Sequence, residues 1–403
     1  MKKFFAAIYI LPMVLWAGCS NKTSHTEHNI PVIQIEKAFN SVDGALLGSW
    51  AKSIEYIPLE TNEESLLSDI QFSDLYPLKE RIYIFTHNGK NITCFDYNGK
   101  YIPFKLHKGR AENELAYPQN MIADEENVIV NDGLHLKIYD HNGNFIRKSA
   151  DLNKPYYLQH LYIHKTGDGN FLFKGEDPDN TSDYVCIVDA DGNTIAQTLI
   201  LNYSASEVEN FKSRSGASSK FSGKEASLGS RVPPRIKPAG ENAYLIIPNN
   251  DTLWRIDERN AGLIPAYIAD SGEYRNVGNR PVEYNRVIGE TNDMLIVKFL
   301  FSPVSYPNID KKYIQSCFVY DKVTNSTLML KHDPKSNCTG FINNLDGGIA
   351  FYPSAIANGK MYQIVDAADF IDAAELTQSE KMMEVAATIT EESNPVLIVC
   401  TLK

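Results

Sequence analysis

A pattern of short strands joined by tight turns recurs in the first half of this chain. Each copy contains an Asp-x-Asn/Asp-Gly turn, and these turns begin at Asp96, Asp140 and Asp189. The steps between them are 44 and 49 residues. A strand-rich repeat of roughly forty to fifty residues is typical of the blades of a β-propeller. The repeat therefore predicts an all-β chain.

Further strand-like segments extend the pattern to six copies. The predicted blades fall at residues 71–106, 118–152, 157–201, 244–256, 294–320 and 349–365. In the last of these the apolar segments are 349–352 and 361–365. The fold class that follows is a six-bladed β-propeller, which spans residues 30–403 as one domain.

The two ends of that domain also have the composition of strands. Residues 30–36 are apolar and then alternate, and residues 54–60 form another strand in which Pro58 favours an edge position. The last apolar run, Val396–Leu402, follows a segment at 367–387 with apolar residues at helical spacing. We expect one or two helices at 367–387, inserted before a strand that closes the ring by pairing with the N-terminal strands.

Residues 204–238 differ in composition from the blades around them. They are rich in Ser, Gly and Lys, and they carry more basic than acidic residues. A loop of this length is usually either functional or disordered. A disordered surface insertion and a lid over one propeller face both remain open.

The N-terminus has the layout of an export signal. Two lysines precede an apolar run that is too short to span a membrane, and small residues lead to Cys19. We interpret residues 1–18 as a lipoprotein signal peptide, Cys19 as the lipidated residue and residues 19–29 as a flexible tether. The alternative is an ordinary leader with an incidental cysteine, because Trp16 stands where Leu is usual.

Charge and motif content exclude several classes of function. The formal net charge is −11, and no basic cluster with interleaved aromatics is present, so nucleic acid is not an expected partner. A calcium loop at Asp189 would need Glu at its twelfth position, which is Ile200. His160 and His164 lie on a predicted strand, too far apart to share one ion. The sequence therefore predicts neither a metal site nor a cofactor, and no catalytic residue is assigned.

Six cysteines are present, and five remain if Cys19 is lipidated. Their spacing matches no zinc motif. Cys94, Cys186 and Cys400 lie in apolar strands, where buried thiols are expected. Cys317 and Cys338 could form a disulfide in an oxidising compartment, and the sequence leaves this open.

One interblade loop, residues 105–117, combines the side chains that ligand sites use. Its candidate ligand-binding residues are His107, Lys108, Arg110, Glu114 and Tyr117. At the mouth of a central channel they would offer donors, acceptors and an aromatic face for a glycan or a peptide. The alternative is a solvated connection between two blades.

The chain resembles the six-bladed β-propeller lipoproteins that are abundant in gut Bacteroidetes, and the likeness covers nearly all of the mature chain. The matching segments are residues 54–61, the turns at 95–99 and 139–143, the loop at 107–117 and the closing residues 394–399. In that family the loop is usually glycine-rich; here Gly109, Glu114 and Tyr117 match its ends, and the central glycines are absent. The resemblance implies an envelope-anchored propeller of a Gram-negative anaerobe. It implies no activity, because no reaction is established for most of the family.

These observations favour a non-enzymatic, lipid-anchored binding module of the outer membrane. Its expected partners are the membrane, through the anchor, and a glycan, a peptide or an envelope protein. The alternative is a cation-dependent hydrolase or lactonase-like propeller, which requires several carboxylates that converge on the channel axis. The sequence leaves undecided whether the protein faces the periplasm or the cell surface.

Overall fold

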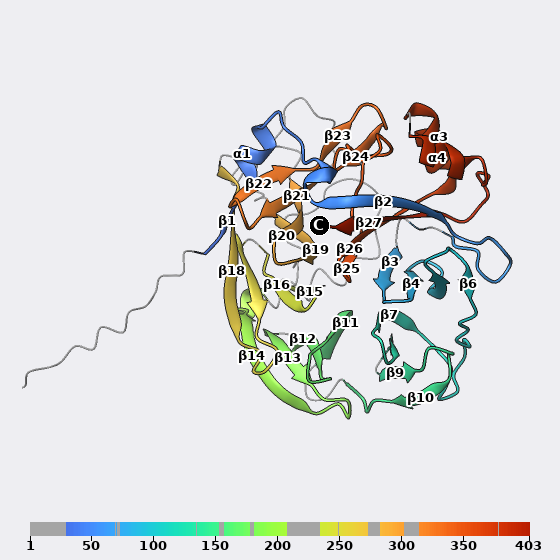
Figure 1. Cartoon of the computed structure of the whole chain (residues 1–403). Helices are drawn as coiled ribbons and strands as arrows, with labels where there is room; N and C mark the ends of the chain where they lie inside the picture. Colours follow the sequence, from blue (N-terminus) through green and yellow to red (C-terminus); the bar gives the residue numbers. More distant parts are fainter. Residues whose placement is uncertain are drawn as a thin grey trace, which may run out of the picture.

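The computed structural model is a six-bladed β-propeller, which confirms the predicted fold class (Figure 1). The residues that it describes are 30–68, 70, 73–133, 135–152, 157–177, 181–207, 234–248, 250–272, 283–301, 314–377 and 379–403. Within them, the strands form six sheets of four or five strands and a further two-stranded sheet. The first strands of neighbouring blades contact one another around the ring, except that the second strand of blade one contacts the first strand of blade two, so the first strands line the propeller axis.

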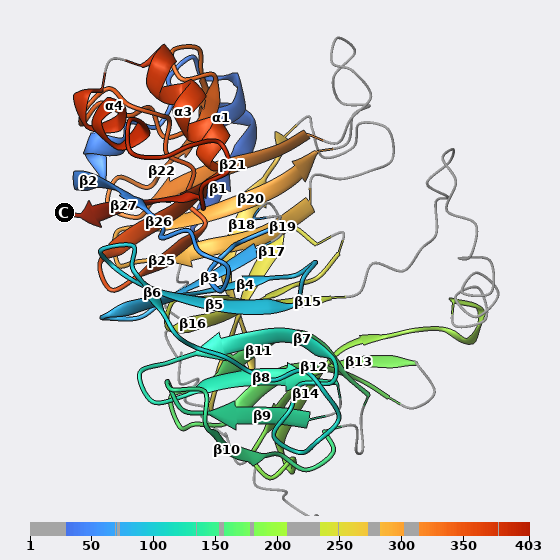
Figure 2. The same ribbon diagram turned by 90° about the vertical axis from the view of Figure 1, so that its right-hand side faces the viewer.

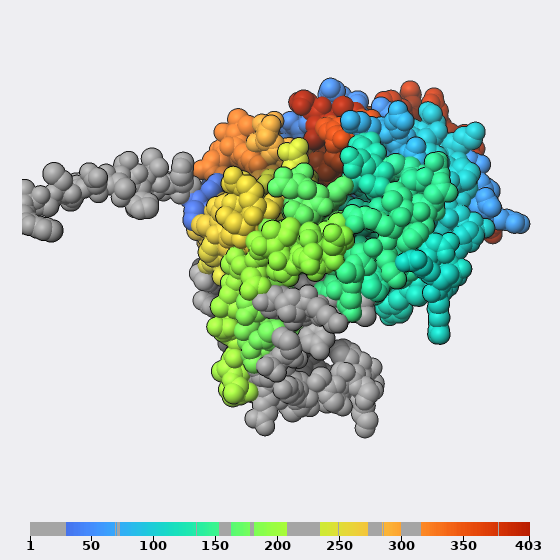
Figure 3. Space-filling view, turned by 90° about the horizontal axis from the view of Figure 1, so that it is seen from below, coloured from blue at the N-terminus to red at the C-terminus, as the bar shows by residue number. Residues whose placement is uncertain are grey.

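Each of the first three blades consists of four consecutive antiparallel strands. Blade one contains β3 (Ser73–Pro77), β4 (Arg81–Thr86), β5 (Asn91–Asp96) and β6 (Tyr101–Ile102). Blade two contains β7 (Pro118–Ala123), β8 (Val128–Asp132), β9 (His135–Tyr139) and β10 (Phe145–Lys148). Blade three contains β11 (Tyr157–Lys165), β12 (Phe171–Glu176), β13 (Ser182–Val188) and β14 (Thr194–Asn202). The hairpin of β13 and β14 projects beyond the ring (Figures 2 and 3).

The other three blades follow the same plan, with additions from the chain ends. Blade four contains β15 (Arg235–Ala239), β16 (Asn242–Ile246), β17 (Thr252–Ile256) and β18 (Leu263–Asp270). Blade five contains β19 (Glu283–Glu290), β20 (Met294–Phe301), β21 (Ile314–Asp321) and β22 (Ser326–Met329), and β23 (Lys331–Asp333) and β24 (Cys338–Gly340) form a small hairpin after it. Blade six contains β25 (Ala355–Ala357), β26 (Lys360–Val365), β27 (Val396–Leu402) and β2 (Ala51–Pro58). Residues 349–352, predicted as a strand of blade six, lie outside the blade; Phe351 there pairs with Phe341 instead.

The ring is closed by the two ends of the chain, as predicted. β27 pairs antiparallel with β2, from Pro58 opposite Val396 to Ala51 opposite Leu402. β2 is the outermost strand of blade six, which is the edge position that Pro58 favoured. Closure therefore depends on contacts between residues that are more than three hundred positions apart in the sequence.

The first described strand is shorter than the sequence suggested. β1 (Val32–Gln34) pairs in parallel with β18 of blade four, and α1 (Ile35–Asn40) begins directly after it. The prediction of a strand through residue 36 was wrong at its end, because Ile35 and Ala38 are buried at the spacing of one helical turn. A short 3₁₀ helix (Leu47–Ser49) leads into β2.

The helices predicted at residues 367–387 are present as α3 (Ala367–Leu376) and α4 (Glu380–Ala386). Asp366 caps the first and Ser379 the second, each by accepting a backbone N–H bond. Phe370 packs edge-on against Tyr56 of β2, at 5.5 Å between ring centroids. The helices lie beside blades five and six (Figure 2), where they cover the closing sheet.

The repeated turns that revealed the fold share one hydrogen-bond pattern. In each, the Asp carboxylate accepts the N–H groups two and four residues further on, at 2.8–2.9 Å. The glycines of these turns have φ between +81° and +90°, a region that other residues rarely adopt. The turn at Asp189 is therefore a hairpin turn, as predicted.

Cys94, Cys186, Cys317, Cys338 and Cys400 are all free thiols, so Cys317 and Cys338 form no disulfide. No described helix is long and apolar enough to cross a membrane. The predicted signal peptide, Cys19 and the tether lie outside the described residues, as do positions 208–233 of the predicted insertion.

Candidate functional site

A cavity of about 950 Å³ opens at the face of the ring where the innermost strands end, and we call it the end-face cavity. Blades one to four all contribute to its wall. Its lining consists of Asp74, Tyr76, residues 120–122 and 124–126, residues 163–169, Pro238, Gly240, Glu241 and Glu258. About half of these residues are in the turns after β7, β11 and β15, which a propeller necessarily brings together around its axis, and most of the others lie on the strands themselves.

The wall of the end-face cavity is strongly acidic. Seven of its residues are carboxylates, opposed by one lysine and one histidine. Apolar side chains also line it, from Tyr76 and Met121 on one side to Ile163 and Pro238 on the other. Negative charge over an apolar lining suits a ligand that carries positive charge on an aliphatic or aromatic body.

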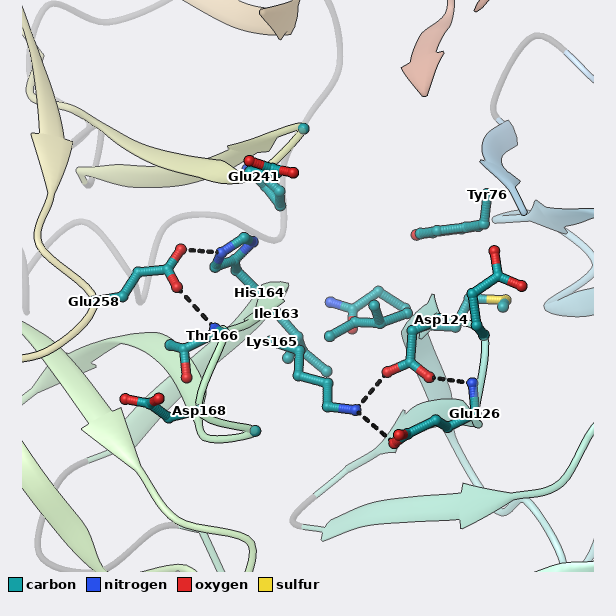
Figure 4. Close-up of a pocket in the computed structure, with 18 of the residues that line it drawn as sticks. Tyr76, Asp124, Glu126, Ile163, His164, Lys165, Thr166, Asp168, Glu241 and Glu258 are labelled. Carbon is teal, nitrogen blue, oxygen red and sulfur yellow. Dashed lines mark hydrogen bonds and ion pairs between the residues drawn. The ribbon is translucent and has the colours of Figure 1, made fainter. Parts of the chain in front are cut away.

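Lys165 holds two of the carboxylates on the blade-two side of the cavity (Figure 4). Its Nζ lies 2.5 Å from Asp124 Oδ2 and 3.7 Å from Glu126 Oε2. Burial would raise the pKa of Asp124, but Lys165 and two backbone N–H groups outweigh it and hold that pKa below its usual value. Asp124 is therefore ionised at neutral pH.

His164 forms the matching contact on the other side of the cavity. Its Nε2 lies 2.6 Å from Glu258 Oε1, and Glu258 Oε2 accepts the backbone N–H of Gly167 at 3.0 Å. Burial would raise the pKa of Glu258, but His164 and Gly167 outweigh it and lower that pKa. These contacts fix the β11–β12 turn to blade four, so this wall is preorganised.

Glu241 and Asp168 differ from the paired carboxylates. Both side chains are exposed, and within the described residues neither forms an ion pair. They are therefore the carboxylates most available to a ligand.

No group of three or more His, Cys, Asp or Glu residues in the described part of the chain has a geometry that could hold a metal ion. His164 lies on β11, as predicted, and it contacts Glu258; the side chain of His160 lies outside what the structure describes. The carboxylates of the end-face cavity are thus spread around the wall, and they do not converge on one point.

The loop predicted as a ligand site lies at the opposite face, where the innermost strands begin. Lys108 and Arg110 line a separate pocket of about 340 Å³, together with residues 88–90. Tyr117 is 60% exposed, and the ammonium of Lys90 lies 3.4 Å from its ring centroid. The loop contributes nothing to the lining of the end-face cavity.

The remaining two candidate side chains of that loop have different surroundings. The Glu114 carboxylate folds back to accept the Ala111 N–H at 2.9 Å, so it stabilises the loop itself. His107 is exposed, and its carbonyl accepts the Leu115 N–H at 2.8 Å. Binding by this loop stays a prediction.

Sequence reasoning missed the end-face cavity. Its carboxylates come from four blades, and each looks like an ordinary turn residue on its own. The run Asp124-Glu125-Glu126 after a strand was the available indication, since three successive acids are more than a turn requires. Their meeting with Glu241 and Glu258 follows only from the ring.

The fold and the site together define a six-bladed propeller with an acidic cavity at one mouth of its channel. The chain belongs to a protein family described as a domain of unknown function (DUF4934), which matches residues 30–401. A solved Bacteroides fragilis protein described as exported has the same fold, with a TM-score of 0.63 and 17% identity over 93% of this chain and 99% of that one.

A more distant resemblance is to the PQQ-bound aldose sugar dehydrogenase of Streptomyces coelicolor, with a TM-score of 0.36 and 9% identity over 87% of this chain and 99% of that one. No curated protein matches the chain.

Proposed function

We propose that this protein is a lipid-anchored propeller of the bacterial cell envelope that binds a positively charged ligand, a basic peptide, in the end-face cavity. The observation that carries the proposal is the charge of that wall, with seven carboxylates facing one lysine and one histidine. The apolar residues beneath them would take the aliphatic stems of Lys or Arg side chains.

The envelope location rests on the N-terminal sequence. Residues 1–18 have the features of a signal peptide that ends before Cys19, and acylation of that cysteine would attach the propeller to the outer membrane. Replacement of Cys19 with Ser should prevent lipid labelling and release the protein from the membrane fraction. Retention of the variant in that fraction would contradict the anchor.

A binding function is favoured over proton transfer because the wall of the end-face cavity is preorganised and its paired carboxylates are ionised. The pKa values of Asp124 and Glu258 are both lowered, so neither is suited to donate a proton at neutral pH. Fixed negative charge contributes instead to ligand attraction and to the choice among ligands.

The test is calorimetric titration of the purified protein with trilysine and, separately, with triglutamate. We expect trilysine to bind with an affinity that falls as salt is added, and triglutamate not to bind. The double variant Asp168→Asn with Glu241→Gln removes two exposed charges without breaking an ion pair among the described residues. At roughly 0.5 kcal/mol for each charge, its affinity for trilysine should fall about fivefold.

The matched control is Glu391→Gln with Glu392→Gln, because both of these carboxylates are exposed in the loop between α4 and β27, away from the cavity. It should bind trilysine as the unmodified protein does. Equal loss in both double variants, or equal binding of trilysine and triglutamate, would refute the proposal.

A further inference from the structure

A second large cavity, of about 940 Å³, lies at the face where the innermost strands begin, and we call it the start-face cavity. Blades five and six form most of its walls, together with residues from the β23–β24 hairpin, from α3 and from the start of β3 in blade one. Two cations line it, Arg286 on β19 and Lys298 on β20. It shares no lining residue with the end-face cavity.

Arg286 and Lys298 are direct cross-strand partners in the β19–β20 pair. Like charges directly opposite each other destabilise a sheet, so this placement opposes folding. A third basic side chain, Lys237 on β15, is buried close by, and burial together with the positive charge of Arg286 lowers its pKa. Repulsion between neighbouring like charges, which lowers stability, is expected at residues that are kept for a functional site.

Among the described residues, Asp74 is the carboxylate within ion-pair distance of this pair. Arg286 Nη2 lies 3.0 Å from Asp74 Oδ1, but Asp74 Oδ2 also contacts His87 Nε2 at 2.8 Å. Lys298 lies over the ring of Tyr352, 5.7 Å from its centroid, and within the described residues no carboxylate is in ion-pair distance of it. Lys298 therefore has no ion-pair partner among the described residues, and the carboxylates of Asp366, Asp369 and Asp372 line the same cavity beyond ion-pair distance of it.

Neutral hydrogen-bonding groups flank the two cations. Gln363 uses its side-chain oxygen to accept the Tyr352 N–H at 2.9 Å, which leaves its NH₂ group as the donor, and the hydroxyl of Ser354 lines the same cavity. Burial raises the pKa of the Tyr352 phenol, so the phenol stays protonated and neutral. The wall thus offers an ammonium, a guanidinium and neutral donors.

We propose that Arg286 and Lys298 form a binding site for the carboxylate group of a small organic ligand. A single negative charge matches Lys298, the cation of the pair that forms no ion pair among the described residues. A dianionic phosphate fits less well, because Asp369 and Asp372 of α3 and its capping residue Asp366 line the same cavity and would repel two negative charges more strongly than one. Arg supplies the planar fork that pairs with two carboxylate oxygens, and Lys adds a point charge beside it.

The probes are butyrate, its neutral isostere butyramide, and sulfate, each added to the purified protein at matched ionic strength. We expect butyrate to raise the melting temperature and to bind in a calorimetric titration, and butyramide to do neither. A shift with sulfate equal to that with butyrate, or no shift with butyrate, would overturn the proposal.

Lys298→Met is the deciding variant, since it removes the charge and keeps the length of the side chain. We expect butyrate affinity to fall about tenfold or more while the melting temperature without ligand rises, because the repulsion from Arg286 is gone. Lys298→Arg keeps the charge and should retain binding. A lysine with only a structural role gives the opposite result, a lower melting temperature in Lys298→Met with butyrate binding unchanged.

Lys381→Met, on the exposed surface of α4, is the matched control and should change neither property. Circular dichroism of each variant reports whether the propeller is intact. If Lys298→Met fails to fold, weaker butyrate binding in Gln363→Leu, which removes the neutral donor alone, supports the site, and unchanged binding there overturns it.

Discussion

Lys237 should make the stability of this protein rise with pH across the neutral and mildly alkaline range. Its side chain lies on β15 and is 5% exposed. Burial first, and then the nearby positive charges of Arg286 and Arg235, lower its pKa to about 7, while Asp74 opposes that shift. In the unfolded chain the pKa of a lysine is about 10.4.

The sign follows from the protons bound in each state. Between about pH 7 and pH 10 the unfolded chain holds a proton that the folded protein has lost, so raising the pH favours folding. From pH 9 down to pH 6, this one group should lower the free energy of unfolding by about 2–3 kcal/mol, at ~1.4 kcal/mol for each pH unit between the two pKa values.

Lys237→Met removes the titration and keeps most of the side-chain volume. We expect the variant to gain stability relative to the unmodified protein, and to gain about 2–3 kcal/mol more at pH 6 than at pH 9. Urea unfolding of both proteins at the two pH values measures this difference. For the control Lys381→Met, exposed on α4, the difference in free energy of unfolding from the unmodified protein should not change with pH. The reasoning would be refuted if the stability difference between Lys237→Met and the unmodified protein were the same at both pH values, or larger at pH 9.

Three further predictions concern separate parts of the ring. Glu290 is a buried carboxylate bonded to Lys322 at 2.6 Å and to two tyrosine hydroxyls, so Glu290→Gln should cost about 3 kcal/mol in urea unfolding. Burial would raise its pKa, but Lys322 and the tyrosines lower it, so the cost should shrink as the pH falls below ~4. Gly99→Ala should lower the free energy of unfolding by at least ~2 kcal/mol, because φ is +81° and a Cβ would lie 2.1 Å from the Pro58 carbonyl oxygen. Gly133 has a similar φ of +71° but open space around it, so Gly133→Ala should cost about half as much. Arg110→Ala with Tyr117→Ala should weaken any ligand of the 340 Å³ pocket without loss of circular dichroism signal, and unchanged affinity would remove this loop from the candidate sites.

The blades could be predicted because each one is specified locally. Asp96 and Gly99 determine their turn within four residues, and the apolar runs beside them form strands regardless of the rest of the chain. The closing pair of β2 and β27 was also predictable, since a ring needs its two ends joined. The short β25 was missed because three half-buried residues carry too little pattern to distinguish a strand from a loop.

The sites were less predictable than the fold. The loop at 105–117 is a candidate in the sequence because its polar and aromatic side chains are close together along the chain. Glu258 and His164 are ninety-four positions apart, and Asp74 and Arg286 more than two hundred. A propeller gathers the ends of six inner strands at one axis, so sequence distance says little about which side chains meet there.

The distribution of charge along the axis connects the two proposed sites. Asp74 lines the end-face cavity and Arg286 lines the start-face cavity. Their 3.0 Å ion pair therefore lies where the two cavities approach each other. Asp74 would repel the carboxylate proposed for the start-face cavity. Arg286 would repel the cation proposed for the end-face cavity. Because they neutralise each other, the acids of blades two to four act mainly on one mouth of the channel and Lys298 mainly on the other. A chain with a net charge of −11 can in this way attract a cation at one face and a carboxylate at the opposite face.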